Sequence, residues 1–342
     1  MAEILYGVSP IGLGHASRAA AVGLKLREMN LDPVFATGGN AAQFLRSYGF
    51  KVHDIVSEPT PSERNGVMRS PSLWYIRYWF GYRSTKSRME SLIDELRPTL
   101  IVGDEEFSCV AAAVERSIEN AMISDELELG FARSWFAYRI ETKVVAWYKD
   151  LQSRASNILV PDFGEDRANL HFMSPVVRAV TRSREQVMAS LGVKDDSKMV
   201  LLSASGSGIG DFLLERVVKS SETLGLKGLV LAVTGLDHGP GEGWVRYLGL
   251  ERDNQDFVAA ADLVVSTAGK STIDEAASYG SPIIAIPIKN HAEQERNAAA
   301  LGFSHEDMND MDRLLPKYLG RRTEPRIYHG ADSIADYLRG LI

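Results

Sequence analysis

The fold is decided by the stretch Ala261-Asp262-Leu263-Val264-Val265-Ser266-Thr267-Ala268-Gly269-Lys270-Ser271-Thr272-Ile273-Asp274-Glu275. It predicts an apolar strand, a tight turn at Gly269, and a helix that begins between Lys270 and Thr272. Such a turn directs free backbone N–H groups and the positive end of a helix toward one point, which suits a diphosphate. Glu275 lies one turn into the helix and is suited to accept hydrogen bonds from sugar hydroxyls beside the anion. The stretch therefore indicates a nucleotide or nucleotide-sugar pocket.

Short apolar runs alternate with amphipathic runs on both sides of this stretch. This alternation predicts mostly parallel sheets covered by helices on both faces. The expected strands cover residues 3–9, 32–36, 51–55, 99–103, 121–124, 198–202, 229–233, 244–248, 263–266 and 282–287. The expected helices cover residues 15–29, 41–48, 72–96, 108–117, 212–224, 255–260, 271–279, 293–301 and 333–342.

The pattern becomes rich in loops near residues 157–164 and then restarts. We therefore expect an α/β fold with two Rossmann-like, doubly wound domains. Their expected bounds are residues 1–165 and 166–322, with a C-terminal helix in 323–342 that packs back on the first domain. Ligands bind beyond the carboxyl ends of the strands in such sheets, so two facing domains would hold the site in a central cleft.

Composition narrows the class of protein. The chain has 342 residues, 45% of them hydrophobic and 24% charged, which is typical of globular domains with real cores. A net charge of −7 argues against a general nucleic-acid binder. The single cysteine, Cys109, excludes a disulfide within the chain and fits a cytoplasmic protein. We expect neither a signal peptide nor a transmembrane helix.

A glycine loop, Gly12-Leu13-Gly14-His15, follows the first strand and opens the first helix. Its two glycines allow a sharp bend and a close approach to a ligand. A dinucleotide fingerprint would need a third glycine near Ser17 and an acid after the second strand, so an NAD site is not indicated. His15 is then either a reactive group at the ligand-binding edge or a helix cap without chemistry.

Two further loops occupy comparable places in the second half. Ser205-Gly206-Ser207-Gly208 follows a strand and either leaves the backbone open to a phosphate or sugar or forms a flexible turn. His291 and Gln294 begin the helix after residues 282–287. They are candidates for contacts with phosphate or sugar hydroxyls, and helix capping is the alternative.

Acidic and aromatic segments in the first half are also candidates. Asp104, Glu105 and Glu106 end a strand, where one of them would serve as a general base or orient an acceptor, unless all lie in a solvated loop. Residues 72–83 and 131–147 mix aromatic and basic side chains, which suits either core packing or a membrane interface with a lipid-linked acceptor. Zinc-ligand spacing, a P-loop and a nucleophile elbow are not found in the sequence.

Together these motifs resemble those of two-domain, GT-B-fold glycosyltransferases related to the N-acetylglucosaminyltransferase that completes the lipid-linked peptidoglycan precursor. The resemblance covers nearly the whole chain and is strongest over residues 197–301. The matching motifs are Gly12-Leu13-Gly14-His15, Ser205-Gly206-Ser207-Gly208, Ala268-Gly269-Lys270-Ser271-Thr272-Ile273-Asp274-Glu275 and Glu293-Gln294-Glu295-Arg296-Asn297-Ala298.

The resemblance implies an inverting transfer from a UDP-sugar, with UDP-N-acetylglucosamine as the first candidate, and no cofactor besides this donor. No Asp-x-Asp motif suits a metal ion, so a metal-independent reaction is expected. His15 would be the general base or orient the acceptor, with Asp104 beside it as a second catalytic candidate. The implied donor contacts are Gly12, Gly14, Gly206 and Ser207 of the glycine loops, the uracil-binding backbone at Leu248, Gly249 and Leu250, the diphosphate-binding residues Gly269, Lys270, Ser271 and Thr272, the ribose-binding Glu275, and His291 and Gln294.

Several departures from the family pattern leave the acceptor open. The first loop has fewer glycines than the cell-wall enzyme's version, and the second loop is rich in serine rather than Gly-Gly-Ser. A lipid-linked acceptor, with peripheral membrane contact through residues 72–83, is one candidate for a cytoplasmic enzyme of this kind. The alternatives are a nucleotide-sugar hydrolase or epimerase on the same fold, and a non-catalytic sugar-nucleotide-binding subunit.

Overall fold

The computed structural model describes residues 3–59, 62–69, 71–125, 135–194, 196–204, 210–226, 228–236, 238–239, 241 and 243–342. The chain divides into two compact units, each of which is described by itself. Unit 1 comprises Met1–Ser62, Ser70–Val177 and Tyr328–Ile342. Unit 2 comprises Glu63–Arg69 and Arg178–Ile327.

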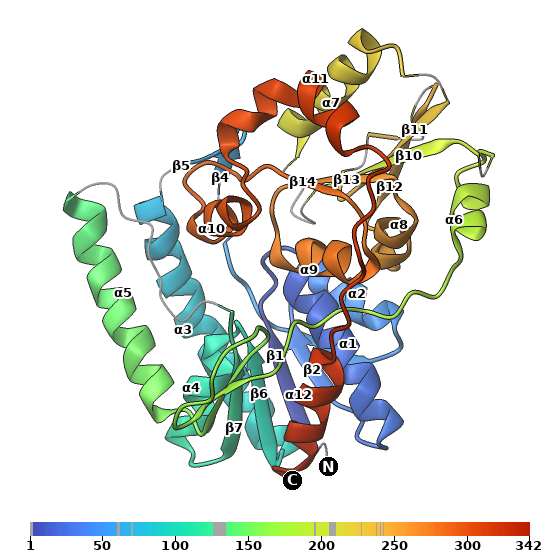
Figure 1. Ribbon diagram of the computed structural model, residues 1–342. Helices are drawn as coiled ribbons and strands as arrows, with labels where there is room; N and C mark the ends of the chain where they lie inside the picture. The colour runs from blue at the N-terminus through green and yellow to red at the C-terminus, as the bar shows by residue number, and fades with distance from the viewer. Residues whose placement is uncertain are drawn as a thin grey trace. The chain divides into compact units, whose positions relative to one another are not determined.

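Unit 1 contains a parallel sheet in the order β3-β2-β1-β6-β7-β8-β9 (Figure 1). Its chain order reverses between β1 and β6, which are neighbours in the middle of the sheet. The strands are β1 (Ile4–Val8), β2 (Val34–Thr37), β3 (Lys51–Asp54), β6 (Leu100–Asp104), β7 (Glu119–Ile123), β8 (Asn157–Val160) and β9 (Leu170–Phe172). The helices are α1 (Gly14–Glu28), α2 (Gly39–Ser47), α3 (Pro71–Leu96), α4 (Phe107–Glu115), α5 (Trp135–Arg154) and α12 (Gly330–Arg339).

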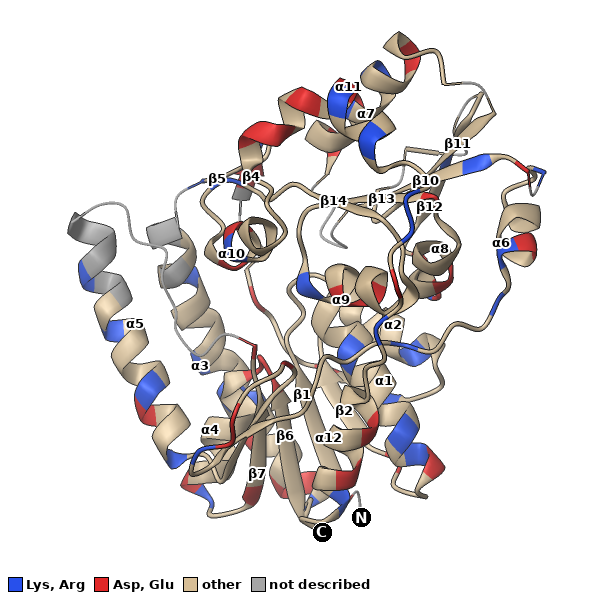
Figure 2. Ribbon diagram, in the orientation of Figure 1, with Lys and Arg blue, Asp and Glu red and all other residues tan. Residues whose placement is uncertain are grey.

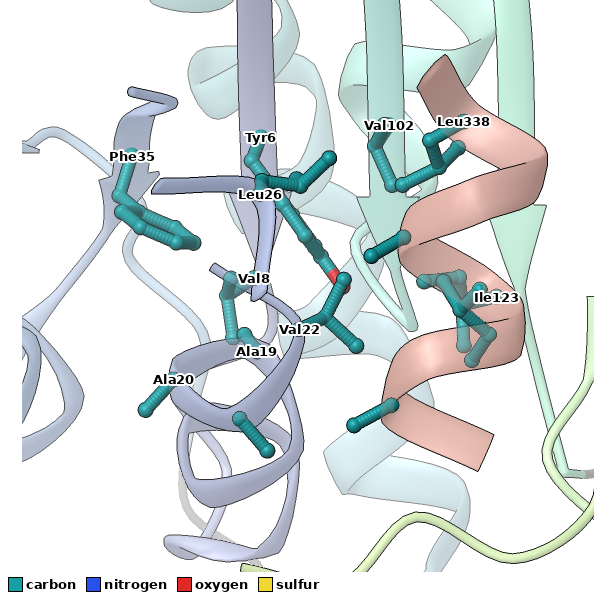
Figure 3. Packing of buried hydrophobic residues seen from close by; sticks show 14 of the residues in the cluster. Tyr6, Val8, Ala19, Ala20, Val22, Leu26, Phe35, Val102, Ile123 and Leu338 are labelled. Atoms are coloured by element: carbon teal, nitrogen blue, oxygen red, sulfur yellow. The ribbon is translucent and has the colours of Figure 1, made fainter. Parts of the chain in front are cut away.

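Alternate residues of the unit 1 strands face opposite layers of helices. Tyr6 and Val8 pack with α1, α2 and α12 in one core, where Leu26 and Leu338 are also fully buried (Figure 3). Leu5, which precedes Tyr6 on β1, packs in a second core with α3, α4 and α5. The sheet is therefore covered on both faces, as the sequence predicts for a doubly wound unit.

Unit 2 contains a second parallel sheet, in the order β12-β11-β10-β13-β14. The buried side chains of its strands again fall into two cores, one on each face of the sheet. One core includes residues of α7, α10 and α11, and the other includes residues of α6, α8 and α9. The strands are β10 (Lys198–Ser203), β11 (Leu229–Thr234), β12 (Val245–Gly249), β13 (Leu263–Ser266) and β14 (Ile283–Ala285). The helices are α6 (Arg184–Ser190), α7 (Asp211–Thr223), α8 (Asn254–Ala260), α9 (Lys270–Tyr279), α10 (Ala292–Ala300), the 3₁₀ helix η1 (His305–Asp310) and α11 (Met311–Tyr318).

The division into units differs from the expected domain bounds in three places. The C-terminal segment of unit 1 begins at Tyr328 rather than at residue 323. Residues 166–177 lie in unit 1, because β9 pairs with β8 and extends the first sheet. A short hairpin, β4 (Ser62–Arg64) and β5 (Val67–Arg69), places Glu63–Arg69 in unit 2 although the flanking chain belongs to unit 1. The C-terminal helix α12 packs against α1, through Ile334 and Leu338 among others.

Two properties of the helices bear on whether the chain crosses a membrane or contacts its surface. No helix among the described residues combines the length and the apolar character that crossing a bilayer requires. Helix α3 nonetheless carries exposed apolar side chains, and Figure 2 shows basic residues along α3 and α5.

Candidate functional site

Two predicted catalytic residues meet at the carboxyl edge of the unit 1 sheet. Strand β1 leads into the first glycine loop, where Gly12 adopts φ +70°, a left-handed conformation that glycine tolerates best. Helix α1 then begins at Gly14 and carries His15 in its first turn. His15 Nδ1 lies 3.1 Å from Oδ1 of Asp104, the last residue of β6. The pair therefore sits where the strand order reverses, the usual ligand-binding point of a doubly wound sheet.

A buried arginine that the sequence interpretation overlooked completes this pair. Arg18 Nε lies 2.9 Å from Asp104 Oδ2, and Arg18 Nη2 lies 2.6 Å from Asp104 Oδ1, which makes a bidentate ion pair. Arg18 Nη1 reaches Asp125 Oδ2 at 3.1 Å. Because residues three apart share a helix face, the spacing of His15 and Arg18 was the available signal. The site is thus a network of two cations and two carboxylates.

The network sets the charge of His15. Burial lowers the pKa of this imidazole, but the hydrogen bond and negative charge of Asp104 raise it more, to about 9. Burial raises the pKa of Asp104, yet the neighbouring Arg18 and His15 bring it below its usual value. The His15 side chain keeps 25% of its surface exposed while that of Asp104 has none. His15 can therefore meet a substrate, and Asp104 acts on it only through the imidazole and Arg18.

The remaining acids of this edge have structural partners. Glu106 is buried and caps α4 by accepting hydrogen bonds from the backbone of Ser108 and Cys109. Burial, with a smaller effect from Glu106, raises the pKa of Glu58 to about 8, and Ser9 donates a hydrogen bond to it. The interpretation of residues 104–106 as a solvated loop is wrong, because Asp104 and Glu106 lie in the protein interior.

The stretch that decides the fold lies at the carboxyl edge of the unit 2 sheet. Strand β13 ends at Ser266, and Ala268 turns the chain at φ +61° before α9 begins at Lys270. A non-glycine residue in this left-handed region is strained, and it persists only where its surroundings hold it. Ala268 is fully buried, and Asn297 of α10 donates a hydrogen bond to its carbonyl oxygen. Asn297 therefore holds the turn in place.

The predicted ribose ligand Glu275 is part of a buried ion pair. Arg178 Nε lies 3.0 Å from Glu275 Oε1, and Arg178 Nη1 donates to the Arg252 carbonyl oxygen. Tyr279, one turn along α9, donates from its hydroxyl to the Arg178 carbonyl oxygen. Arg178 is the first residue of unit 2 after the chain leaves unit 1. It lies 97 residues before Glu275, so the sequence pattern did not predict that the two residues pair.

The other predicted donor contacts follow neighbouring strands of the same edge. Gly249 ends β12 at φ +57°, its carbonyl accepts a hydrogen bond from Gly235, and the next residue, Leu250, is exposed. Gln294 Oε1 accepts from the backbone N–H of Ile288 in the loop after β14. The parallel strands thus bring residues 248–250, 269–275 and 288–294 to one edge.

Burial lowers the pKa of His291 to about 4, so the imidazole is neutral at pH 7. A neutral imidazole favours a hydroxyl over a charge-paired phosphate as its partner. Gly206 and Ser207, predicted to contact the donor, lie outside the described residues. Lys270 of α9 pairs with Asp274 at 3.0 Å, so its ammonium is directed along its own helix.

Comparisons with known proteins agree with this arrangement. Residues 233–316 match the glycosyltransferase family 28 C-terminal domain. The chain is 24% identical over 317 residues to an uncharacterized glycosyltransferase of Methanosarcina acetivorans, covering 87% of this chain and 83% of that protein. It is 26% identical over 305 residues to the UDP-N-acetylglucosamine–N-acetylmuramyl-(pentapeptide) pyrophosphoryl-undecaprenol N-acetylglucosamine transferase of a Nocardioides species, covering 83% of this chain and 78% of that enzyme.

The fold is shared with the solved glycotransferase of kitacinnamycin, with a TM-score of 0.66, 14% identity, and coverage of 99% of this chain and 98% of that one. Two Rossmann-like units, a family 28 domain in the second, and these relatives define the class of protein. The chain is a GT-B-fold glycosyltransferase related to the N-acetylglucosaminyltransferase of the lipid-linked peptidoglycan precursor. The resemblance seen in the sequence is thereby confirmed.

Proposed function

We propose that this glycosyltransferase transfers a hexose, with N-acetylglucosamine as the first candidate, from a UDP-sugar to an acceptor hydroxyl with inversion. One observation carries the donor half of the proposal. The family 28 match over residues 233–316 includes the predicted contacts at 248–250, 269–272, Glu275, His291 and Gln294, and the parallel sheet of unit 2 brings them to one edge. The first turn of α9 would then receive the diphosphate.

The acceptor half of the proposal rests on the His15–Asp104 pair. The hydrogen bond from Nδ1 to Asp104 leaves Nε2 of His15 as the nitrogen that faces a substrate. The acceptor oxygen attacks the anomeric carbon, its proton passes to Nε2, and the bond from the anomeric carbon to the phosphate oxygen breaks. The departing UDP carries the negative charge, which the N-terminus of α9 stabilises without a metal ion in this proposal.

Thermal shift tests the donor. We expect UDP and UDP-N-acetylglucosamine to raise the Tm of the native chain more than ADP or GDP does, since a ligand of the folded state stabilises it. Glu275→Gln removes the carboxylate proposed to bind ribose and should abolish the shift. Its own effect on Tm must be subtracted, because the substitution also breaks the pair with Arg178.

Asp262→Asn is the matched control. Asp262 pairs with Arg184 at 2.9 Å, but it precedes β13 and therefore lies at the opposite edge of the same sheet from Glu275. This variant should keep the full shift with UDP. If the native chain responds to ADP or GDP and not to uridine nucleotides, the proposed donor is wrong.

A lipid-linked acceptor is the finer part of the proposal, and α3 supports it. The sequence left residues 72–83 open to either core packing or a membrane interface, and the described side chains include both kinds. Tyr82 is buried in the core, whereas Ile76, Trp79 and Phe80 are exposed. Phe80 keeps 70% of its surface exposed, and the exposed Arg77 is its neighbour on the helix. Apolar and basic side chains on one exposed helix suit an anionic membrane surface.

Vesicle sedimentation tests this surface. We expect the native chain to sediment with vesicles of phosphatidylglycerol and phosphatidylcholine, and Phe80→Ser to weaken this binding several-fold, because a phenyl group no longer enters the interface. Phe163→Ser, which alters another exposed phenylalanine of unit 1, is the control. Equal binding by the native chain and Phe80→Ser would remove the support for a membrane contact at α3.

A further inference from the structure

A short segment of the first half of the chain belongs to unit 2. Residues 63–69 are preceded and followed by chain that folds in unit 1, yet β4 and β5 join unit 2 as a hairpin (Figure 1). The hairpin is tightened at Gly66, where the backbone N–H donates to the Glu63 carboxylate. Only these seven residues of the N-terminal half belong to unit 2, so their contacts there indicate what the hairpin does.

The hairpin binds the loop that carries the predicted sugar contacts. The Lys289 backbone N–H donates to the Gly66 carbonyl oxygen at 2.7 Å, and the Met68 N–H donates to the Lys289 carbonyl oxygen at 2.9 Å. These two bonds form a parallel bridge between Val67 and Lys289. The Asn290 side chain adds a longer contact of 3.5 Å to the Met68 carbonyl oxygen.

Further hydrogen bonds of the loop 288–294 are made within residues 288–295 themselves. Gln294 accepts from Ile288 N–H, Glu295 accepts from Asn290 N–H, and the Ile288 carbonyl accepts from His291 N–H. Asn290 adopts φ +73°, a left-handed conformation that asparagine adopts more readily than most residues with a side chain. The Lys289 peptide is therefore where a distant segment of the chain fixes the loop that presents His291 and Gln294.

The hairpin also packs at Gly66 against the side chains of Phe212 and His305, and this packing holds the hairpin in position. Gly66 adopts φ +75°, and a Cβ there would come within 2.9 Å of His305 Cε1 and of two ring carbons of Phe212. His305 donates a hydrogen bond from Nδ1 to the carbonyl oxygen of Pro287, the residue just before the loop 288–294. Phe212 lies in the first turn of α7, the helix that follows the second glycine loop.

We propose that the hairpin of residues 63–69 is a positioning element of the donor site, which holds the loop 288–294 in the conformation that recognises the sugar of the nucleotide-sugar. Gly66 and Met68 are its positioning residues. The proposal rests on the proposed function, because it assigns the sugar to this loop. It makes recognition of the donor sugar depend on a segment of the N-terminal half of the chain, whereas the diphosphate-binding turn of α9 does not need the hairpin.

Two substitutions displace the hairpin by different means. Gly66→Ala forces the new methyl group against Phe212 and His305, and Met68→Pro removes the N–H that donates to Lys289. Gly192→Ala is the control, because Gly192 also lies in unit 2 at φ +70° but has open space around a Cβ. The control therefore carries the same backbone strain without the collision.

The experiment measures the Kd of UDP and of UDP-N-acetylglucosamine by calorimetry on the full chain, together with hydrogen–deuterium exchange without ligand. We expect Gly66→Ala and Met68→Pro to weaken UDP-N-acetylglucosamine binding by about tenfold relative to Gly192→Ala, because a small misplacement of contacting groups is enough. UDP affinity should be unchanged. Exchange of the peptide covering residues 288–294 should become faster in both variants.

Three outcomes overturn the proposal. Variants that match Gly192→Ala in affinity and exchange show that the hairpin does not hold the loop. An equal loss for UDP and UDP-N-acetylglucosamine shows general damage to unit 2 rather than positioning of the sugar loop. A native chain that binds neither nucleotide overturns the proposed function itself, and the exchange measurement then still reports whether the hairpin orders the loop.

Discussion

Replacing His15 with alanine is expected to lower kcat for sugar transfer by about 10²–10⁴-fold, the usual contribution of a positioned general base. UDP affinity should change little, since the residues proposed to bind the uracil, the ribose and the diphosphate at α9 are residues of unit 2. The measurement is steady-state transfer with the donor found by thermal shift, together with the Kd of UDP. Loss of transfer with intact donor binding would also exclude a non-catalytic subunit.

The control for this substitution is a second histidine–aspartate pair in unit 1. His171 Nδ1 lies 3.2 Å from Asp166, with the carboxylate exposed to solvent. His171→Ala removes an imidazole of the same kind and should leave kcat unchanged. If both variants lose activity equally, or if His15→Ala retains native kcat, His15 is not the base.

The pKa of His15 makes the same prediction testable through pH. With a pKa of about 9, roughly one imidazole in a hundred is neutral at pH 7, and kcat/KM should therefore rise with pH until about pH 9. The effect on stability has the opposite direction. Because the folded pKa lies above the ordinary 6.5, the stabilisation is fully present below pH 6.5 and is lost as the pH rises through 9. Imidazole NMR and urea unfolding at several pH values measure both.

Asp104→Asn is expected to destabilise the protein by about 3–5 kcal/mol, the usual effect of removing one partner from a buried ion pair. The variant leaves Arg18 in the interior with Asp125 as its remaining carboxylate. It also removes the charge that raises the pKa of His15, while burial of the imidazole remains, so that pKa should fall below its ordinary value. Urea unfolding and imidazole NMR measure the two effects.

Asp166→Asn is the control for this second prediction, since it removes a carboxylate from the exposed pair with His171. Its stability should stay close to that of the native chain, because exposed ion pairs contribute little. An Asp104→Asn protein with native stability, in which His15 still titrates near pH 9, would show that the network does not control the imidazole.

Local patterns in the sequence predicted most of the secondary structure. Apolar runs bounded by glycine or polar residues located β1, β13 and α9 to within one or two residues, because buried strands and helix starts leave strong local signals. The strands β4, β5, β8 and β9 and the helices α5, α6 and α11 were missed. Strands β4, β5 and β9 are only three residues long, and pairing with a neighbouring strand holds them rather than their own apolar content.

The sequence by itself determined the fold class and the positions of the candidate site, because periodic burial and glycine turns are local properties of the chain. It located His15, Asp104 and Glu275 without their partners. Only the tertiary structure decided that Arg18 joins Asp104 and that Arg178 joins Glu275, across 86 and 97 residues of chain. A buried charge needs an opposite charge wherever the fold brings one near, and that proximity is set by the pairing of whole strands and helices rather than by neighbouring residues.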